Sequence, residues 1–243
     1  MDAIAARINA VRERIAAAAQ QAGRSAGEVR LIGVTKTQPP ERIERALAAG
    51  LTDFGENRVQ EAEPKIAALA YAHPPASWRL IGHLQRNKAK KAAALFDAVD
   101  SLDSLDLART LDRHVGELAQ RTQARLPVLL QVNVSGEASK EGFALVGWEE
   151  QPALFDAFCA EVEALLALPH LHIRGLMTIA PWSSDPEAAR PTFRSTRRLR
   201  DRLAQRFQGD WDELSMGMTD DFAVAIAEGA TLVRVGRAIF GER

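Results

Sequence analysis

The stretch VRLIGVTKTQPPERIERALAAG at residues 29–50 indicates the fold more clearly than any other part of the sequence. Its first six residues, 29–34, are mostly β-branched or aliphatic, which is typical of a buried strand. Pro39 and Pro40 suit the start of a helix, where a missing N–H group costs nothing, and Gly50 suits a helix end. The stretch therefore predicts a strand, a loop and a helix in that order.

The same alternation of strand and helix continues along the chain and favours a parallel sheet with crossover helices. Counting 29–34, eight strands are expected, the others at 53–55, 78–81, 98–102, 127–134, 172–178, 213–216 and 232–235. Further helices are expected at 57–70, 86–95, 104–120, 151–167, 186–208 and 220–228. The alternative is an open doubly wound sheet, but its G-x-G-x-x-G fingerprint and a phosphate loop ending in Gly-Lys-Ser/Thr are absent. We therefore expect residues 1–243 to form a single α/β domain, a (β/α)8 barrel of the TIM type with an extra N-terminal helix.

The composition favours a cytoplasmic protein without membrane or nucleic-acid partners. Residues 1–23 place Ile4, Ile8 and Val11 at helical spacing, which predicts an amphipathic helix rather than a signal peptide. No apolar run approaches the roughly 20 residues needed to span a bilayer. The 31 Lys and Arg residues nearly balance the 32 Asp and Glu residues, so net charge gives nucleic-acid binding no support. Cys159, the single cysteine, cannot form an internal disulfide and suits a reducing compartment.

Lys36 is the first candidate functional residue. Functional groups of a (β/α)8 barrel gather at the carboxyl ends of the strands, and Lys36 closes the run LIGVTK at such an end. A rim lysine in contact with solvent is the simpler interpretation. The alternative is a lysine whose partly desolvated amine loses its proton and attacks an aldehyde to form a Schiff base.

The last two strand ends predict an anion site. LSMGMTDD at 214–221 and LVRVGRAIFG at 232–241 occupy the positions where barrels commonly bind phosphate through backbone N–H groups at helix starts. Hydroxyl donors and glycines that permit close backbone approach occur in these loops: Ser215, Gly217, Thr219 and Gly236. We expect a helix to open at Thr219, so an ordinary N-cap is the competing interpretation of that residue.

Arg234 precedes Gly236 by two residues in the last strand, so the two positions share a face. A buried arginine must be paired or must serve a ligand, because an uncompensated buried charge is costly. The pattern leaves two alternatives open: contact with a bound ligand, or a structural salt bridge inside the barrel with an acidic residue such as Glu56.

Seven sequence blocks in matching order and spacing make the chain resemble the pyridoxal phosphate homeostasis proteins. The blocks are GVTKTQP at 33–39, FGENRVQE at 54–61, IGHLQRNKAK at 81–90, NVSGEASKEGF at 133–143, RGLMTIAP at 174–181, LSMGMTDD at 214–221 and VRVGRAIFG at 233–241. The resemblance runs nearly end to end. It implies a barrel like the N-terminal domain of alanine racemase, with pyridoxal 5'-phosphate carried as a Schiff base on Lys36.

The same resemblance implies how the cofactor is held. It assigns the phosphate to Ser215, Thr219 and the backbone at Gly236 and Arg237, the pyridine nitrogen to Arg234, and the surroundings of the ring to Asn57. Three residues depart from the family pattern: Arg58 stands where an aromatic residue is common, Arg237 where threonine is common, and Thr219 where serine is common. Thr219 keeps the hydroxyl group, so its phosphate role is retained.

The implied function is a carrier that takes part in intracellular pyridoxal phosphate homeostasis without significant turnover. An arginine at the pyridine nitrogen favours the unprotonated ring, which is a weak electron sink. Racemases of the similar fold add a tyrosine base from a second domain, whereas the single tyrosine of this chain, Tyr71, falls near a predicted surface turn. The implied partners are apoenzymes that need the cofactor, and a monomer is expected. The alternative is a weak amino-acid racemase, or a Schiff-base aldolase without a cofactor.

Three further signals are set aside. The histidines show no H-E-x-x-H spacing and no paired C-x-x-C accompanies them, so no metal site is expected; they are His73, His83, His114, His170 and His172. The basic cluster at 86–91 contains no interleaved aromatic residues and predicts a solvated helix face. Cys159 lies in an apolar stretch and is expected in the core.

Overall fold

The computed structural model describes residues 2–118, 125–137 and 140–241. The strands in this part are β1 (Arg30–Val34), β2 (Asp53–Glu56), β3 (Ser77–Leu80), β4 (Ala98–Leu102), β5 (Leu126–Asn133), β6 (Phe143–Ala144), β7 (Leu171–Met177), β8 (Glu213–Ser215) and β9 (Leu232–Val235). The α-helices are α1 (Ala3–Gln21), α2 (Pro40–Ala48), α3 (Val59–Ala68), α4 (Ala89–Leu95), α5 (Leu105–Gly116), α6 (Pro152–Leu166), α7 (Arg190–Arg206), α8 (Phe222–Ala227) and α9 (Arg237–Phe240). Short 3-10 helices cover Ala26–Glu28, Arg86–Lys88 and Pro186–Ala189.

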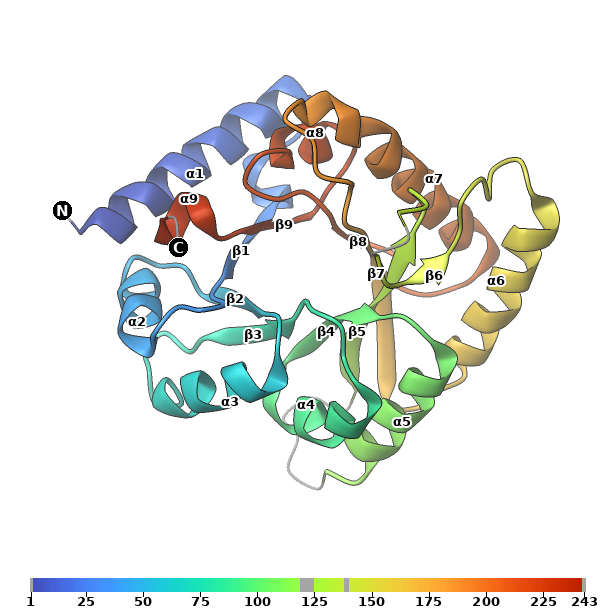
Figure 1. Ribbon diagram of the computed structural model, residues 1–243, viewed down its shortest axis with the longest axis horizontal. Coiled ribbons are helices and arrows are strands. Elements are labelled where there is room, and N and C mark those ends of the chain that lie inside the picture. The colour runs from blue at the N-terminus through green and yellow to red at the C-terminus, as the bar shows by residue number, and fades with distance from the viewer. Residues whose placement is uncertain (1, 119–124, 138–139, 242–243) are drawn as a thin grey trace.

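Eight of these strands form a closed parallel barrel. Their order is β4-β3-β2-β1-β9-β8-β7-β5, and a further pairing of β4 with β5 closes the ring. β6 pairs only with the end of β5 and lies outside the ring. Figure 1 shows the ring of strands with the helices around it. The predicted (β/α)8 barrel is confirmed, and the open doubly wound sheet is excluded because such a sheet keeps two unpaired edges.

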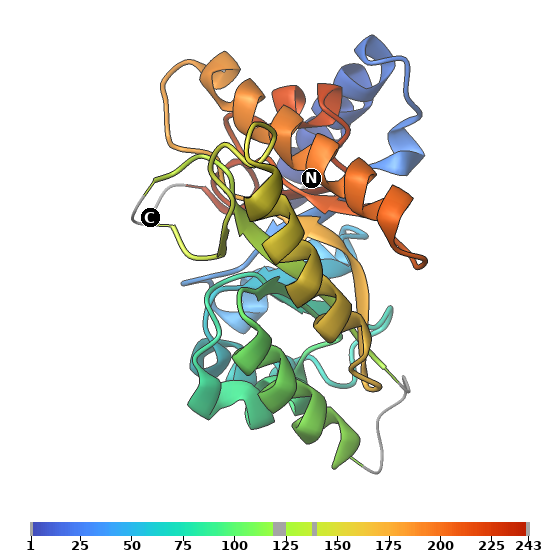
Figure 2. The same cartoon turned by 90° about the vertical axis from the view of Figure 1, so that its right-hand side faces the viewer.

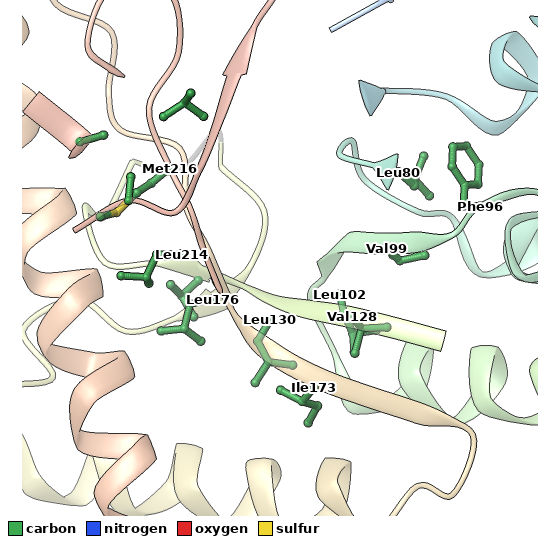
Figure 3. Close-up of a cluster of buried hydrophobic side chains, with 14 of the residues drawn as sticks. Leu80, Phe96, Val99, Leu102, Val128, Leu130, Ile173, Leu176, Leu214 and Met216 are labelled. Atoms are coloured by element: carbon green, nitrogen blue, oxygen red, sulfur yellow. The ribbon is translucent and has the colours of Figure 1, made fainter. Parts of the chain in front are cut away.

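Two apolar layers follow from the alternation of side chains along the strands. The smaller layer lies in the barrel interior and contains Ile32, Leu129, Met177 and Leu232. The larger layer lies between the strands and the helices; Figure 3 shows side chains of β5 and β7 in this layer, Leu130, Ile173 and Leu176 among them. Cys159 of α6 lies in this outer layer and is buried, as predicted.

The N-terminal helix α1 completes the outer ring. The helix after the last strand, α9, has only four residues, and α1 packs against α8, α9 and α2 beside it (Figure 1). Ile4, Ile8, Val11 and Ile15 form its buried face. Burial of each such side chain is worth about 1.5–3 kcal/mol. The extra helix predicted from the sequence therefore takes the place of an eighth barrel helix.

Polar contacts tie neighbouring outer helices together. The guanidinium carbon of Arg202 in α7 lies 4.5 Å from the ring centroid of Phe155 in α6, and Figure 2 shows these helices on the same side of the barrel. Glu228, at the end of α8, accepts hydrogen bonds from Arg190 at 2.8 Å and Arg194 at 2.9 Å.

No helix within the described ranges combines the length and apolar character needed to cross a membrane.

The structure departs from the predicted elements in three places. β6 is an additional short strand, and α9 is a helix in the segment VGRAIFG for which none was predicted. α8 begins at Phe222 with Asp221 as its N-cap residue, so the expected helix start at Thr219 is wrong. The end of the helix predicted at 104–120 falls partly on residues outside the described ranges, and α5 ends at Gly116.

Candidate functional site

Lys36 lies just beyond β1, at the end of the barrel where the strands have their carboxyl termini, here called the mouth. Ile32 of β1 points into the interior cluster. The backbone stays extended through Thr35, whose N–H donates to the Gly55 carbonyl at 3.0 Å and whose hydroxyl turns outward and donates to Glu56 at 2.6 Å. Lys36 follows directly in a turn at the carboxyl end of β1, and it is partly buried there.

The loops after β8 and β9 each contain a glycine in close contact with a neighbouring element. Gly217 has a φ of +91°, and a β-carbon there would lie 2.5 Å from that of Ala225, so both conformation and space require glycine. A β-carbon at Gly236 would lie 3.3 Å from the carbonyl oxygen of Val34. The backbone after Gly236 therefore approaches the strand end that leads to Lys36.

A turn joins β8 to α8 and contains Thr219. The Asp221 carboxylate accepts a hydrogen bond from the Met218 N–H at 2.6 Å, and this contact holds the turn ahead of the helix. Thr219 is therefore not the N-cap residue, which was the competing interpretation of its hydroxyl group. Arg237 forms an ion pair with Asp220, which links this turn to the loop after β9.

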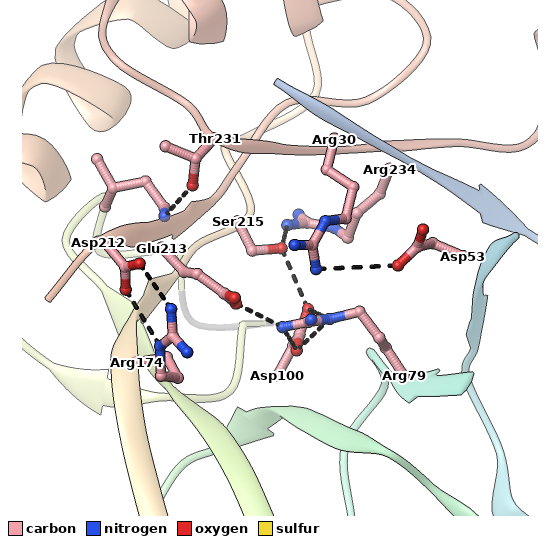
Figure 4. Close-up of polar contacts among 11 residues, drawn as sticks. Arg30, Asp53, Arg79, Asp100, Arg174, Asp212, Glu213, Ser215, Thr231 and Arg234 are labelled. Atoms are coloured by element: carbon pink, nitrogen blue, oxygen red, sulfur yellow. Dashed lines mark hydrogen bonds and ion pairs between the residues drawn. The ribbon is translucent and has the colours of Figure 1, made fainter. Parts of the chain in front are cut away.

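Arg234 lies below these loops and is buried inside the barrel (Figure 4). Its Nη1 donates to the Ser215 hydroxyl at 2.8 Å and its Nη2 donates to the Thr178 carbonyl at 2.9 Å. Burial lowers the pKa of Arg234, whereas the negative charges of Asp100 and Asp221 oppose this change. The guanidinium group is thus fixed in position by two neutral acceptors.

A chain of buried charges supports Arg234 from below. The Ser215 hydroxyl donates to Asp100 at 3.4 Å, and Asp100 accepts from Arg79 Nε at 2.9 Å. Arg79 Nη2 also contacts Glu213 at 2.7 Å, as Figure 4 shows. Burial would lower the pKa of Arg79, but the charges of Asp100 and Glu213 outweigh it and raise that pKa. Two acidic and two basic side chains therefore compensate each other within the barrel.

These contacts bear on two expectations. Glu56 is not the partner of Arg234: it points outward and binds Lys65 of α3 at 2.7 Å, because β2 places it on the face opposite the interior. The Ser215 hydroxyl contacts Arg234 and Asp100, and Ser215 is completely buried; its predicted contact with a phosphate group stays a prediction. Arg234 forms no ion pair among the described residues; its link to an interior carboxylate, Asp100, runs through the Ser215 hydroxyl.

Asn57 follows β2 and lies against the loop after β3. A β-carbon at Gly82 would lie 2.3 Å from the Asn57 carbonyl oxygen, so the two loops are in close backbone contact. The side-chain oxygen of Asn57 is buried and has no hydrogen-bond partner among the described residues. An unsatisfied buried polar atom is rare in native proteins and suits a place where a ligand binds.

A groove of about 770 Å³ opens beside Asn57. Arg58, Glu61, His83 and Lys88 contribute to its walls. Arg58 and Lys88 give this side of the mouth a positive charge, which suits an anionic ligand.

The rim of the mouth also carries a polar group that the sequence did not reveal. The nearest ligand-type atoms of His83, Asp103 and Glu141 lie within 4.8 Å of one another. His83 Nδ1 is 2.8 Å from Asp103 Oδ2. This hydrogen bond orients His83 at the rim of the mouth.

The arrangement fits a phosphate-bearing aldehyde. A lysine, two glycine-containing loops and an unsatisfied amide surround the mouth, and a buried arginine lies beneath it. Asp100, Arg79 and Lys65 were not predicted as members of the site. The sequence does contain a signal that could have indicated these residues: each is a charged residue inside a predicted buried strand or on the inner face of a predicted helix.

Comparison with known proteins supports this assignment. The model of the alanine racemase N-terminal domain matches residues 6–243. The pyridoxal phosphate homeostasis protein of Pseudomonas aeruginosa is 45% identical over 246 residues, which cover 100% of this chain and 97% of that protein. PipY of Synechococcus elongatus, solved with pyridoxal phosphate bound, is 37% identical with a TM-score of 0.81 over 98% of this chain and 100% of PipY.

Alanine racemase of Clostridium difficile is similar in fold alone, with 12% identity and a TM-score of 0.70 over 100% of this chain and 57% of the racemase. The full-length matches above are far more similar in sequence. The chain therefore belongs to the alanine racemase N-terminal domain family and, within it, to the pyridoxal phosphate homeostasis proteins.

Proposed function

We propose that this protein binds pyridoxal 5'-phosphate covalently through Lys36 and serves as a carrier in the homeostasis of that cofactor. The observation that carries the proposal is the position of Lys36 at the mouth, next to the loop of Gly236 and above the buried Arg234. Full-length similarity to the Pseudomonas aeruginosa homeostasis protein and to PipY with bound cofactor supports it.

The phosphate group would be held by the loops after β8 and β9. Thr219 offers a hydroxyl donor outside the helix, and the backbone N–H groups after Gly236 offer further donors at the start of α9. The ion pair of Arg237 with Asp220 would hold the two loops together around the phosphate. Gly217 would allow the tight turn that this arrangement needs.

The ring would lie between Asn57 and Arg234. Arg234 would face the pyridine nitrogen, and the Ser215 hydroxyl would help to position Arg234. Bound pyridoxal phosphate supplies an aldehyde carbon that condenses with a primary amine. The Lys36 nitrogen would form a C=N bond with that carbon, the C=O bond would break, and the oxygen would leave as water.

A carrier without significant turnover is the activity that the surrounding residues support. Arginine, a cation, disfavours protonation of the pyridine nitrogen, so carbanions next to the bound cofactor would gain little stabilisation. Tyr71 lies between α3 and β3, at the end of the barrel opposite the mouth, and is 93% exposed. It cannot serve as a base at the mouth.

The biological setting follows from the same proposal. A carrier would limit the concentration of a free, reactive aldehyde and would pass the cofactor to apoenzymes that need it. We further propose that residues 1–243 act as one domain and as a monomer, and that the protein works in the cytoplasm, where its single buried Cys159 stays reduced.

Amino-acid α-proton exchange in heavy water separates the carrier from a racemase. The loaded protein would be incubated with a panel of amino acids, and exchange would be followed by NMR against free pyridoxal phosphate. We expect no exchange above the rate of the free cofactor. Exchange well above that rate would contradict the carrier proposal and favour a racemase.

Cofactor transfer tests the carrier activity itself. The loaded protein would be mixed with an apo-aminotransferase, and recovered aminotransferase activity would be compared with that given by an equal amount of free cofactor. We expect activity to recover as the loaded protein loses its cofactor. If the loaded protein kept all of its cofactor over a period in which free cofactor fully reactivates the aminotransferase, the result would argue against delivery.

A further inference from the structure

Lys65 of α3 is a buried lysine outside the groups assigned to the cofactor. Its side chain is 6% exposed. The Nζ atom donates to the Thr35 carbonyl at 2.8 Å, to Glu56 Oε1 at 2.7 Å and to Glu61 Oε1 at 2.7 Å. An ammonium group has three N–H donors, so all of them are satisfied in this position.

The three acceptors of Lys65 connect it to the main chain on both sides of Lys36. On the preceding side, Lys65 holds the carbonyl of Thr35, and Glu56 accepts from the hydroxyl of the same threonine at 2.6 Å. On the following side, Glu61 accepts a hydrogen bond from the backbone N–H of Thr37. Lys36 is therefore placed between two fixed residues.

Thr37 adopts a backbone conformation that needs such support. Its φ is +65°, and it is the non-glycine residue with a positive φ within the described part of the chain. A β-branched residue disfavours the left-handed region, so the surrounding contacts must hold it there. The hydrogen bond to Glu61 meets this requirement at the residue next to Lys36.

The charges in this cluster depend on one another. Glu56 is fully buried, and burial raises its pKa despite the hydrogen bonds from Lys65 and Thr35. Burial would also raise the pKa of Glu61, but hydrogen bonds from Lys65 and from the Thr37 N–H lower it overall. Removal of the Lys65 charge would leave two carboxylates close together, so Glu56 and Glu61 could not both keep their present positions.

We propose that Lys65, with Glu56 and Glu61, is a positioning cluster that fixes the backbone around Lys36 and so aims its amine at the cofactor's aldehyde. The inference rests on the proposed role of Lys36. Glu56 directly precedes Asn57 in the chain, so the same cluster also anchors the loop that carries the unsatisfied amide. α3 is thus a support for both sides of the cofactor site.

The test compares Lys65→Met with Lys91→Met. Lys91 of α4 also pairs with a glutamate of α3, Glu63, at 2.7 Å, but both side chains are about half exposed. The first readout is the second-order rate constant for covalent addition of pyridoxal phosphate, followed by absorbance and trapped with borohydride. The second is hydrogen exchange of the Thr37 amide.

We expect Lys65→Met to slow covalent addition by about 10- to 100-fold, because a displaced amine loses its alignment. The same variant should exchange the Thr37 amide faster. Lys91→Met should match the wild-type protein in both measurements. Covalent addition at the wild-type rate in Lys65→Met would overturn the inference, whether or not the Thr37 amide exchanges faster.

A milder pair of variants covers the case in which Lys65→Met does not fold. Glu61 is half-buried, so Glu61→Ala should fold while removing the acceptor of the Thr37 N–H. We expect slower addition in Glu61→Ala and recovery toward the wild-type rate in Glu61→Gln, whose amide oxygen can still accept. Equal rates in both variants and the wild type would overturn the inference. A wild-type protein that forms no adduct would instead refute the proposed function.

Discussion

The buried charge chain below Arg234 makes Asp100→Asn the most informative test of the barrel interior. Asp100 is fully buried and compensates Arg79 directly and Arg234 through Ser215. Loss of one partner of a buried pair costs about 3–5 kcal/mol. Because Arg79 keeps its contact with Glu213, we expect the lower end, about 3 kcal/mol.

Urea unfolding followed by circular dichroism measures this cost. With an m-value of about 3 kcal/mol per M, the midpoint of Asp100→Asn should fall by about 1 M. Asp212→Asn is the matched control, because Asp212 also binds an arginine, Arg174, through two hydrogen bonds but is exposed. An exposed pair contributes about 0–1 kcal/mol, so the control midpoint should fall by less than about 0.3 M. Equal shifts in the two variants would refute the reasoning.

Three further predictions concern the turn after β8, the outer helices and the core. Gly217→Ala should lower the free energy of unfolding by about 1–3 kcal/mol, because φ is +91° there, and thermal melting measures it. Burial would raise the pKa of Glu228, but hydrogen bonds from two α7 arginines lower this pKa overall. The ionised Glu228 therefore stabilises the folded protein fully above about pH 4.3, and this contribution is lost as the pH falls through the lowered pKa. Glu228→Gln should therefore be less stable than the wild type near pH 6, and the difference should vanish at low pH in urea midpoints measured across that range. Burial raises the pKa of the Cys159 thiol, so a thiol reagent should label it only after unfolding, which mass spectrometry detects.

The sequence predicted the fold well where one local pattern decides each element. Strands and helices alternate along the whole chain, and all eight predicted strands appear in the barrel. The sequence did not reveal that α1 substitutes for the last barrel helix, because this depends on packing between the two ends of the chain. It also missed β6, since two residues carry too little periodicity to indicate a strand.

The candidate site was predictable only in part. The rule that function gathers at strand ends led to Lys36 and to the glycine-containing loops. The supporting charges were missed because their partners are distant in sequence: Arg79 binds Asp100 and Glu213, which come from β4 and β8. Strand alternation can place a side chain inside a barrel, but it does not identify the residue opposite.

The most direct test of the central claim is to locate the covalent link. The purified protein, incubated with pyridoxal phosphate, would be examined by visible absorption, reduced with borohydride and analysed by peptide mass mapping. We expect a yellow protein whose reduced adduct lies on Lys36. A colourless, unmodified protein, or an adduct on another lysine such as Lys140, would contradict the account.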